Sequence, residues 1–127
     1  MTRHFALALV AQHPSKLSYD LVWEGLFKGT GKDGFDDALR ACISYDFRDR
    51  LEEISCPTLI VWGAEDSVLS VDDAHEFERH IPQSEKVVME DTGHVPQLER
   101  PQAFNETLLA FLTKAEEQPR SSEAAAA

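Results

Sequence analysis

The sequence predicts an α/β fold built around one strand, helix, strand unit between Cys56 and Pro101. Thr58–Trp62 is apolar, rich in β-branched residues and closed by Gly63, which is typical of a parallel strand buried on both faces. A second short strand is expected over Lys86–Met89, and an amphipathic helix lies between the two. These observations predict two parallel strands joined by a right-handed crossover and flanked by helices.

The crossover helix has recognisable start and stop signals. Ser70-Val71-Asp72-Asp73 predicts a capped helix start, because acids in the first turn suit the helix dipole. Ala74, Phe77 and Ile81 recur at helical spacing, and Pro82 should end the helix.

The residues before this unit predict helices without strands. Phe5–Ala11 is uniformly apolar and should form a short buried helix, and a second amphipathic segment follows Ser18. Gly29–Gly34 has the composition of a loop. Apolar residues at helical spacing then predict a helix over Asp33–Tyr45.

After the unit, a final helix is expected to begin at Pro101, since proline suits the first turn. The stripe that should face the sheet consists of Phe104, Leu108, Phe111 and Leu112. Residues from Ala115 to Ala127 have the composition of a disordered tail.

Composition limits the class of protein. The chain has 127 residues, enough for one domain, and a net charge of -11, which argues against nucleic acid as a partner. Phe5–Ala11 is too short to span a bilayer, so no membrane is expected. Cys42 and Cys56 are interpreted as buried free thiols, which favours the cytoplasm.

Two polar residues follow the ends of the two predicted strands. Asp66 comes three residues after Gly63, and His94 comes soon after the second strand. Neighbouring strands lie about 4.8 Å apart, so the two side chains can meet at the edge of the sheet where ligands bind. A carboxylate beside an imidazole fixes its tautomer and stabilises its protonated form. Glu65 is the competing acid, and Glu99 is expected to brace the His94 loop.

The runs CPTLIVWGAED and TGHVPQLERP, with the amphipathic final helix, resemble the C-terminal end of the α/β-hydrolase fold over about Tyr45 to Leu112. The resemblance implies a partial α/β-hydrolase fold in which Asp66 is the acid and His94 the histidine of a catalytic triad. It divides the chain into a helical cap remnant at 1–30, the C-terminal part of the core at 31–114 and a tail at 115–127.

The resemblance also implies a small-molecule substrate with an ester or related bond, and no cofactor. Substrate contacts are expected from the cap and from the loops after the strands, at Trp23, Phe27, Val68, Leu69 and Val95. No metal site is expected, because Glu76 and His80 share a helix face but no second pair of ligands converges on them.

The sequence contains no recognisable nucleophile. None of its nine serines lies in a G-x-S-x-G elbow. Two interpretations stay open. The chain is part of a larger hydrolase whose nucleophile lies outside it, or it is a non-catalytic remnant that acts as a binding module. Because two parallel strands leave an open edge, we expect the chain to be unstable alone, or to associate with a missing N-terminal half or with itself.

Overall fold

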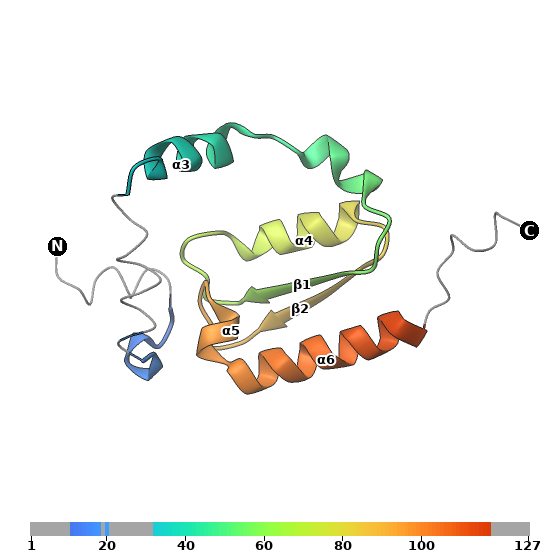
Figure 1. Cartoon of the computed structure of the whole chain (residues 1–127). Helices are drawn as coiled ribbons and strands as arrows, with labels where there is room; N and C mark the ends of the chain where they lie inside the picture. Colours follow the sequence, from blue (N-terminus) through green and yellow to red (C-terminus); the bar gives the residue numbers. More distant parts are fainter. Residues whose placement is uncertain (1–10, 19, 21–31, 118–127) are drawn as a thin grey trace, which may run out of the picture.

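The computed structural model of the chain describes residues 11–18, 20 and 32–117 (Figure 1). In chain order the elements are the 3-10 helix η1 (Pro14–Lys16), α3 (Phe35–Ser44), the 3-10 helix η3 (Arg48–Glu53), β1 (Thr58–Gly63), α4 (Val71–His80), β2 (Ser84–Met89), α5 (Pro96–Glu99) and α6 (Pro101–Glu117).

The two strands form a parallel sheet, which confirms the predicted α/β fold. Within the described residues the sheet has two strands, paired in register from Thr58 opposite Ser84 to Gly63 opposite Met89. Helix α4 is the crossover between them, and Figure 1 shows α4 and α6 on opposite sides of the sheet. The second strand begins two residues earlier than predicted.

Helix α4 forms for the reasons that the sequence indicated. The Ser70 hydroxyl oxygen accepts a hydrogen bond from the Asp72 N–H at 3.2 Å, which caps the first turn. Ala74 is fully buried and Ile81 is 5% exposed, so the apolar face of the helix packs on the strands. The helix ends at His80, immediately before Ile81 and Pro82.

Strand β1 is only partly buried, which corrects the prediction that it is buried on both faces. Ile60 and Gly63 are buried, whereas the rest of the strand is half-buried. Thr58 and Ala64 donate their N–H groups to the β2 side, at Gln83 and Met89. Because the direction of the peptide groups alternates along a strand, those of residues 59 and 61 face the other edge, where the described residues supply no strand. The buried indole N–H of Trp62 likewise has no acceptor among the described residues.

Helix α3 forms as predicted but packs poorly. It has no buried residue, and Phe35, Leu39 and Ile43 are 39%, 48% and 77% exposed. In Figure 1 this helix lies beyond α4, away from the sheet. The prediction that Cys42 and Cys56 are buried is wrong, because Cys42 lies on this unpacked helix and Cys56 on the exposed approach to β1; both thiols are free and exposed.

Helix α6 contacts β1 and continues further than predicted. Phe104, Leu108 and Phe111 are half-buried, but Leu112 is 46% exposed and does not belong to the sheet-facing stripe. The stripe continues instead at Ala115, four residues after Phe111. Since the helix extends to Glu117, the predicted tail boundary at residue 115 is three residues too early, and residues 118–127 lie outside the described part.

Some predictions fall on residues that the structure does not describe. These are most of the Phe5–Ala11 helix and the segment after Ser18, including Trp23 and Phe27. Among the helices that are described, none has both the length and the apolar character required to cross a bilayer.

Candidate active site

Asp66 and His94 lie side by side at the carboxyl ends of the two strands. His94 Nδ1 is 2.9 Å from Asp66 Oδ2. The Asp66 side chain is 4% exposed and that of His94 is 32% exposed. Since Nδ1 faces the carboxylate, Nε2 is the ring nitrogen left to exchange a proton with a reacting group. The prediction that these two side chains meet is confirmed.

Backbone groups hold the Asp66 carboxylate in place. Its Oδ1 accepts the N–H groups of Val68 and Leu69 at 2.8 and 3.0 Å. Burial raises the pKa of Asp66, but the hydrogen bond from His94 and those from the Leu69 and Val68 N–H groups together lower this pKa below its ordinary value. Asp66 is therefore ionised near neutral pH and can stabilise a protonated imidazole.

A reciprocal pair of hydrogen bonds joins the loops that carry the acid and the histidine. The Thr92 N–H donates to Glu65 Oε2 at 2.8 Å, and the Glu65 N–H donates to the Thr92 carbonyl at 3.0 Å. Thr92 is fully buried, and its hydroxyl donates to the Glu90 carbonyl at 2.9 Å. Glu65, the competing acid in the sequence, thus contacts the backbone before His94 and leaves Asp66 as the partner of the imidazole.

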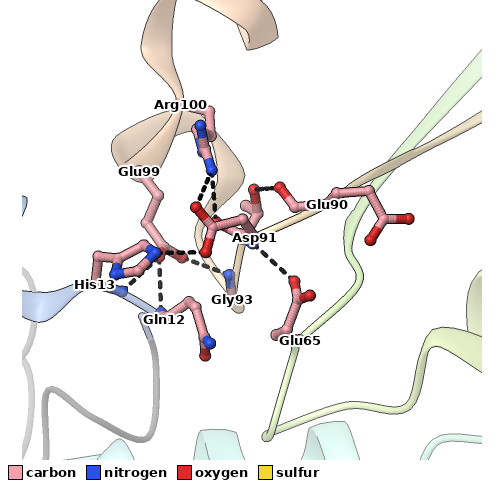
Figure 2. A network of polar contacts seen from close by, with 9 residues as sticks. Gln12, His13, Glu65, Glu90, Asp91, Gly93, Glu99 and Arg100 are labelled. Atoms are coloured by element: carbon pink, nitrogen blue, oxygen red, sulfur yellow. Dashed lines mark hydrogen bonds and ion pairs between the residues drawn. The ribbon is translucent and has the colours of Figure 1, made fainter.

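Glu99 braces the His94 loop, as predicted from the sequence. Its Oε1 accepts the Gly93 N–H at 2.8 Å. Its Oε2 accepts the Gln12 N–H at 2.7 Å and the His13 N–H at 3.3 Å (Figure 2). The sequence analysis did not anticipate this second half of the contact, because no local pattern connects positions separated by 87 residues.

Gly63 permits the two loops to approach each other. A Cβ atom at this position would lie 2.0 Å from the Gly93 carbonyl oxygen and 2.3 Å from that of Thr92. Both are backbone atoms that no side-chain rotation can move. The sequence marked Gly63 only as the end of a strand, so its role in bringing the loops together emerges from the structure.

The remaining predicted site residues are only partly placed. The side chains of Val68 and Leu69 are about half exposed next to Asp66, and Val95 is half-buried beside His94. Trp23 and Phe27 lie outside the described residues. Within the described part of the chain, no group of three or more His, Cys, Asp or Glu side chains is arranged to hold a metal ion.

The chain is similar to known hydrolases. Residues 27–101 match the model of the alpha/beta hydrolase fold family. The chain is 33% identical over 116 residues to 3-oxoadipate enol-lactonase 2 of Acinetobacter baylyi, covering 89% of this chain and 41% of that protein. It is 43% identical over 70 residues to a 2-hydroxy-6-oxononadienedioate/2-hydroxy-6-oxononatrienedioate hydrolase of Klebsiella pneumoniae, covering 55% of this chain and 24% of that protein.

A solved structure gives the same result. Est816, an N-acyl homoserine lactone degrading enzyme, superposes with a TM-score of 0.57 at 41% identity, covering 61% of this chain and 31% of that chain. The chain thus spans less than half the length of each of these relatives. Matching the family model over more than half its own length, this chain belongs to the alpha/beta hydrolase fold family.

Proposed function

We propose that the chain supplies the acid, Asp66, and the histidine, His94, of a catalytic triad in a hydrolase of small esters or related substrates. The observation that carries this proposal is the 2.9 Å contact between Asp66 Oδ2 and His94 Nδ1 at the carboxyl ends of adjacent parallel strands. In open α/β sheets this is the edge at which ligands bind.

Each residue has a defined role in the proposed reaction. His94 Nε2 removes the proton from a nucleophile as it attacks the substrate carbonyl, and later returns that proton to the leaving group. Asp66 holds the imidazole in the tautomer with the proton on Nδ1 and stabilises the imidazolium that forms. The low pKa of Asp66 favours this role, because the carboxylate keeps its negative charge.

We propose that the nucleophile comes from outside this sequence, because none of its serines lies in a G-x-S-x-G elbow. We propose that the part of the fold bearing the nucleophile pairs with the outer edge of β1. The outward peptide groups at residues 59 and 61, beside which the described residues supply no strand, support this arrangement.

The relatives suggest the substrate class. One is named a lactonase, one a hydrolase of a dienedioate or trienedioate, and one a lactone-degrading enzyme. We propose an ester, a lactone or an activated C–C bond next to a carbonyl as the bond cleaved. Val68, Leu69 and Val95, with Trp23 and Phe27, are the proposed substrate contacts.

A hybrid enzyme tests the proposal. This chain replaces the matching segment of the Acinetobacter baylyi lactonase, and hydrolysis of an enol-lactone and of p-nitrophenyl acetate is measured. We expect activity that falls by about 10⁴-fold in kcat on His94→Ala or Asp66→Asn, because each change disables the triad. His80→Ala is the matched control, since His80 is an exposed histidine on α4, and it should leave the rate unchanged.

Two outcomes would contradict the proposal. Activity that survives His94→Ala would remove the catalytic assignment. A folded hybrid without activity, while the parent lactonase remains active under the same conditions, would favour the alternative that the chain is a non-catalytic binding module.

A further inference from the structure

Two consecutive peptide groups before His94 each donate to a carboxylate. The Thr92 N–H donates to Glu65, which belongs to the loop after β1, and the Gly93 N–H donates to Glu99, the last residue of α5. Hydrogen bonds to an ionised acceptor are roughly twice as strong as those between neutral groups. The backbone leading into His94 is therefore held from two separate elements.

Glu99 differs from Glu65 in using both carboxylate oxygens. Its Oε1 accepts the Gly93 N–H, whereas its Oε2 accepts the N–H groups of Gln12 and His13. One carboxylate thus joins the His94 loop to a segment that lies 86 and 87 residues before Glu99 in the chain. Figure 2 shows Glu99 pointing from its helix to the point where Gln12, His13 and Gly93 converge.

The packing around Gly93 shows how closely this segment lies against the loop. A Cβ atom on Gly93 would be 2.7 Å from the Gln12 nitrogen, 3.1 Å from the Ala11 carbonyl carbon and 3.0 Å from Glu99 Oε1. Ala11 itself is 3% exposed. There is no room for a side chain between the loop and the segment, so a shift of either one is transmitted to the other.

A second contact joins the same two parts of the chain. His13 Nε2 lies 2.5 Å from Asp91 Oδ1, and Arg100 donates to the Asp91 carbonyl at 3.1 Å and pairs with its carboxylate. Asp91 has a positive φ of 54°, a conformation that aspartate adopts more readily than most residues. The turn that leads from β2 toward His94 is thus held on one side by His13 and on the other by Arg100.

We propose that Glu65 and Glu99 are positioning residues for His94, and that Glu99 makes the orientation of the imidazole toward Asp66 depend on the placement of residues 12–13. This inference rests on the proposed function, since it concerns the same histidine. Neither glutamate is assigned contact with the substrate: both act through the backbone that carries His94.

Amide hydrogen exchange of the full chain, followed by NMR, tests the contacts one by one. Glu99→Ala should speed exchange at Gln12, His13 and Gly93 by about tenfold or more, because each N–H loses a charged acceptor. Glu65→Ala should do the same at Thr92. Glu90→Ala is the matched control: its side chain points away from the network in Figure 2, and Thr92 bonds to its backbone carbonyl, so exchange should not change.

Glutamine substitutions distinguish the roles of Glu65 and Glu99. A glutamine side chain has one accepting oxygen. Glu65→Gln should therefore keep the protection of Thr92, whereas Glu99→Gln should protect either Gly93 or the pair Gln12 and His13, but not both. Equal behaviour of the two glutamine variants would overturn the proposal that Glu99 bridges two segments, and it remains measurable if the alanine variants do not fold.

The positioning role needs a readout at the site itself. The titration of the Asp66 carboxyl group, followed by ¹³C NMR, should move upward toward the ordinary range in Glu99→Ala and Glu65→Ala, because His94 is no longer held against it. The pKa of Asp66 should stay lowered in Glu65→Gln, because this variant keeps an acceptor for the Thr92 N–H. It should also be unchanged in Glu90→Ala. An unaltered Asp66 titration in a folded Glu99→Ala variant would overturn the positioning role.

These measurements do not require enzymatic activity, so their outcome does not depend on whether the proposed function is correct. Loss of the triad assignment in the hybrid lactonase would leave the exchange results intact. Conversely, unchanged exchange and titration would remove the positioning role while His94 remained the triad histidine.

Discussion

The loops around His94 and helix α3 present opposite relations between local sequence and packing. Helix α3 has a clear amphipathic pattern and forms as predicted, yet none of its ten residues is buried. The loops after β1 and β2 have no periodic pattern, yet Thr92 is fully buried there and hydrogen bonds connect four segments of the chain. Periodicity therefore predicts that an element forms, whereas burial depends on whether other parts of the fold meet it.

Two glycine-to-alanine substitutions should show the largest difference in stability between the loops around His94 and helix α3. Gly63→Ala should lower the free energy of unfolding by about 3 kcal/mol or more, because the new Cβ collides with the backbone of Thr92 and Gly93. Gly34→Ala, at the start of α3, should cost only about 1 kcal/mol, because its φ of 84° disfavours alanine but open space surrounds it. Urea unfolding followed by circular dichroism measures both, and equal losses would contradict the difference in packing.

Two isoleucine-to-alanine substitutions compare the burial of apolar side chains in β1 and in α3. Ile60→Ala in β1 should destabilise the protein by about 2–4 kcal/mol, since Ile60 is 8% exposed and its removal leaves a cavity. Ile43→Ala in α3 should change the stability by less than about 0.5 kcal/mol, because Ile43 is 77% exposed. The urea midpoints of the two variants provide the measurement. A large loss at Ile43 would show that another part of the protein covers α3.

Two threonine-to-valine substitutions compare a buried hydroxyl hydrogen bond with an exposed one. Thr92→Val should cost about 1 kcal/mol, because the buried hydroxyl donates to the Glu90 carbonyl and valine leaves that acceptor without it. Thr113→Val in α6 should cost less than about 0.5 kcal/mol, because its exposed hydroxyl donates to the Leu109 carbonyl where water can replace it. Thermal unfolding of both variants checks the difference, and a larger effect at Thr113 would contradict it.

The smallest expected effect is on how the stability of the folded chain depends on pH. Asp66 has a pKa below its ordinary value in the folded chain, so the unfolded chain binds the proton more readily. The stability from this group is present above the ordinary carboxyl pKa and is lost as the pH falls through the folded value. We expect Asp66→Asn to flatten the decline of stability in acid, measured as urea midpoints across that range, and an unchanged slope would contradict this origin.

Asp46 offers the matched comparison outside the site. Arg48 lowers the pKa of Asp46 to about 2, but this pair is exposed at the start of η3. Salt at about 1 M should therefore remove the contribution of Asp46 to the acid slope and leave that of Asp66 largely in place, because screening acts mainly on exposed charges. Equal salt sensitivity of the two slopes would contradict the burial of Asp66.

Much of the site could be predicted from the sequence. The order of strand, Asp66, helix, strand, His94 predicts which edge of the sheet carries each residue, because parallel strands end on the same side. The choice of Asp66 over Glu65, which the family resemblance supported, and the expected bracing by Glu99 both agree with the contacts. The exposure of Cys42, Cys56 and β1 was not predictable in this way, because it depends on which neighbours cover them.

The sequence by itself determined that two parallel strands and their crossover helix form, and that an acid and a histidine follow the strands. Local preferences and hydrophobic spacing act between near neighbours, so these features can be read from the chain directly. Only the tertiary structure decided that Gly63 must lack a side chain and that Glu99 joins residues 12–13 to the histidine loop. Both depend on contacts between distant segments, which no local pattern encodes.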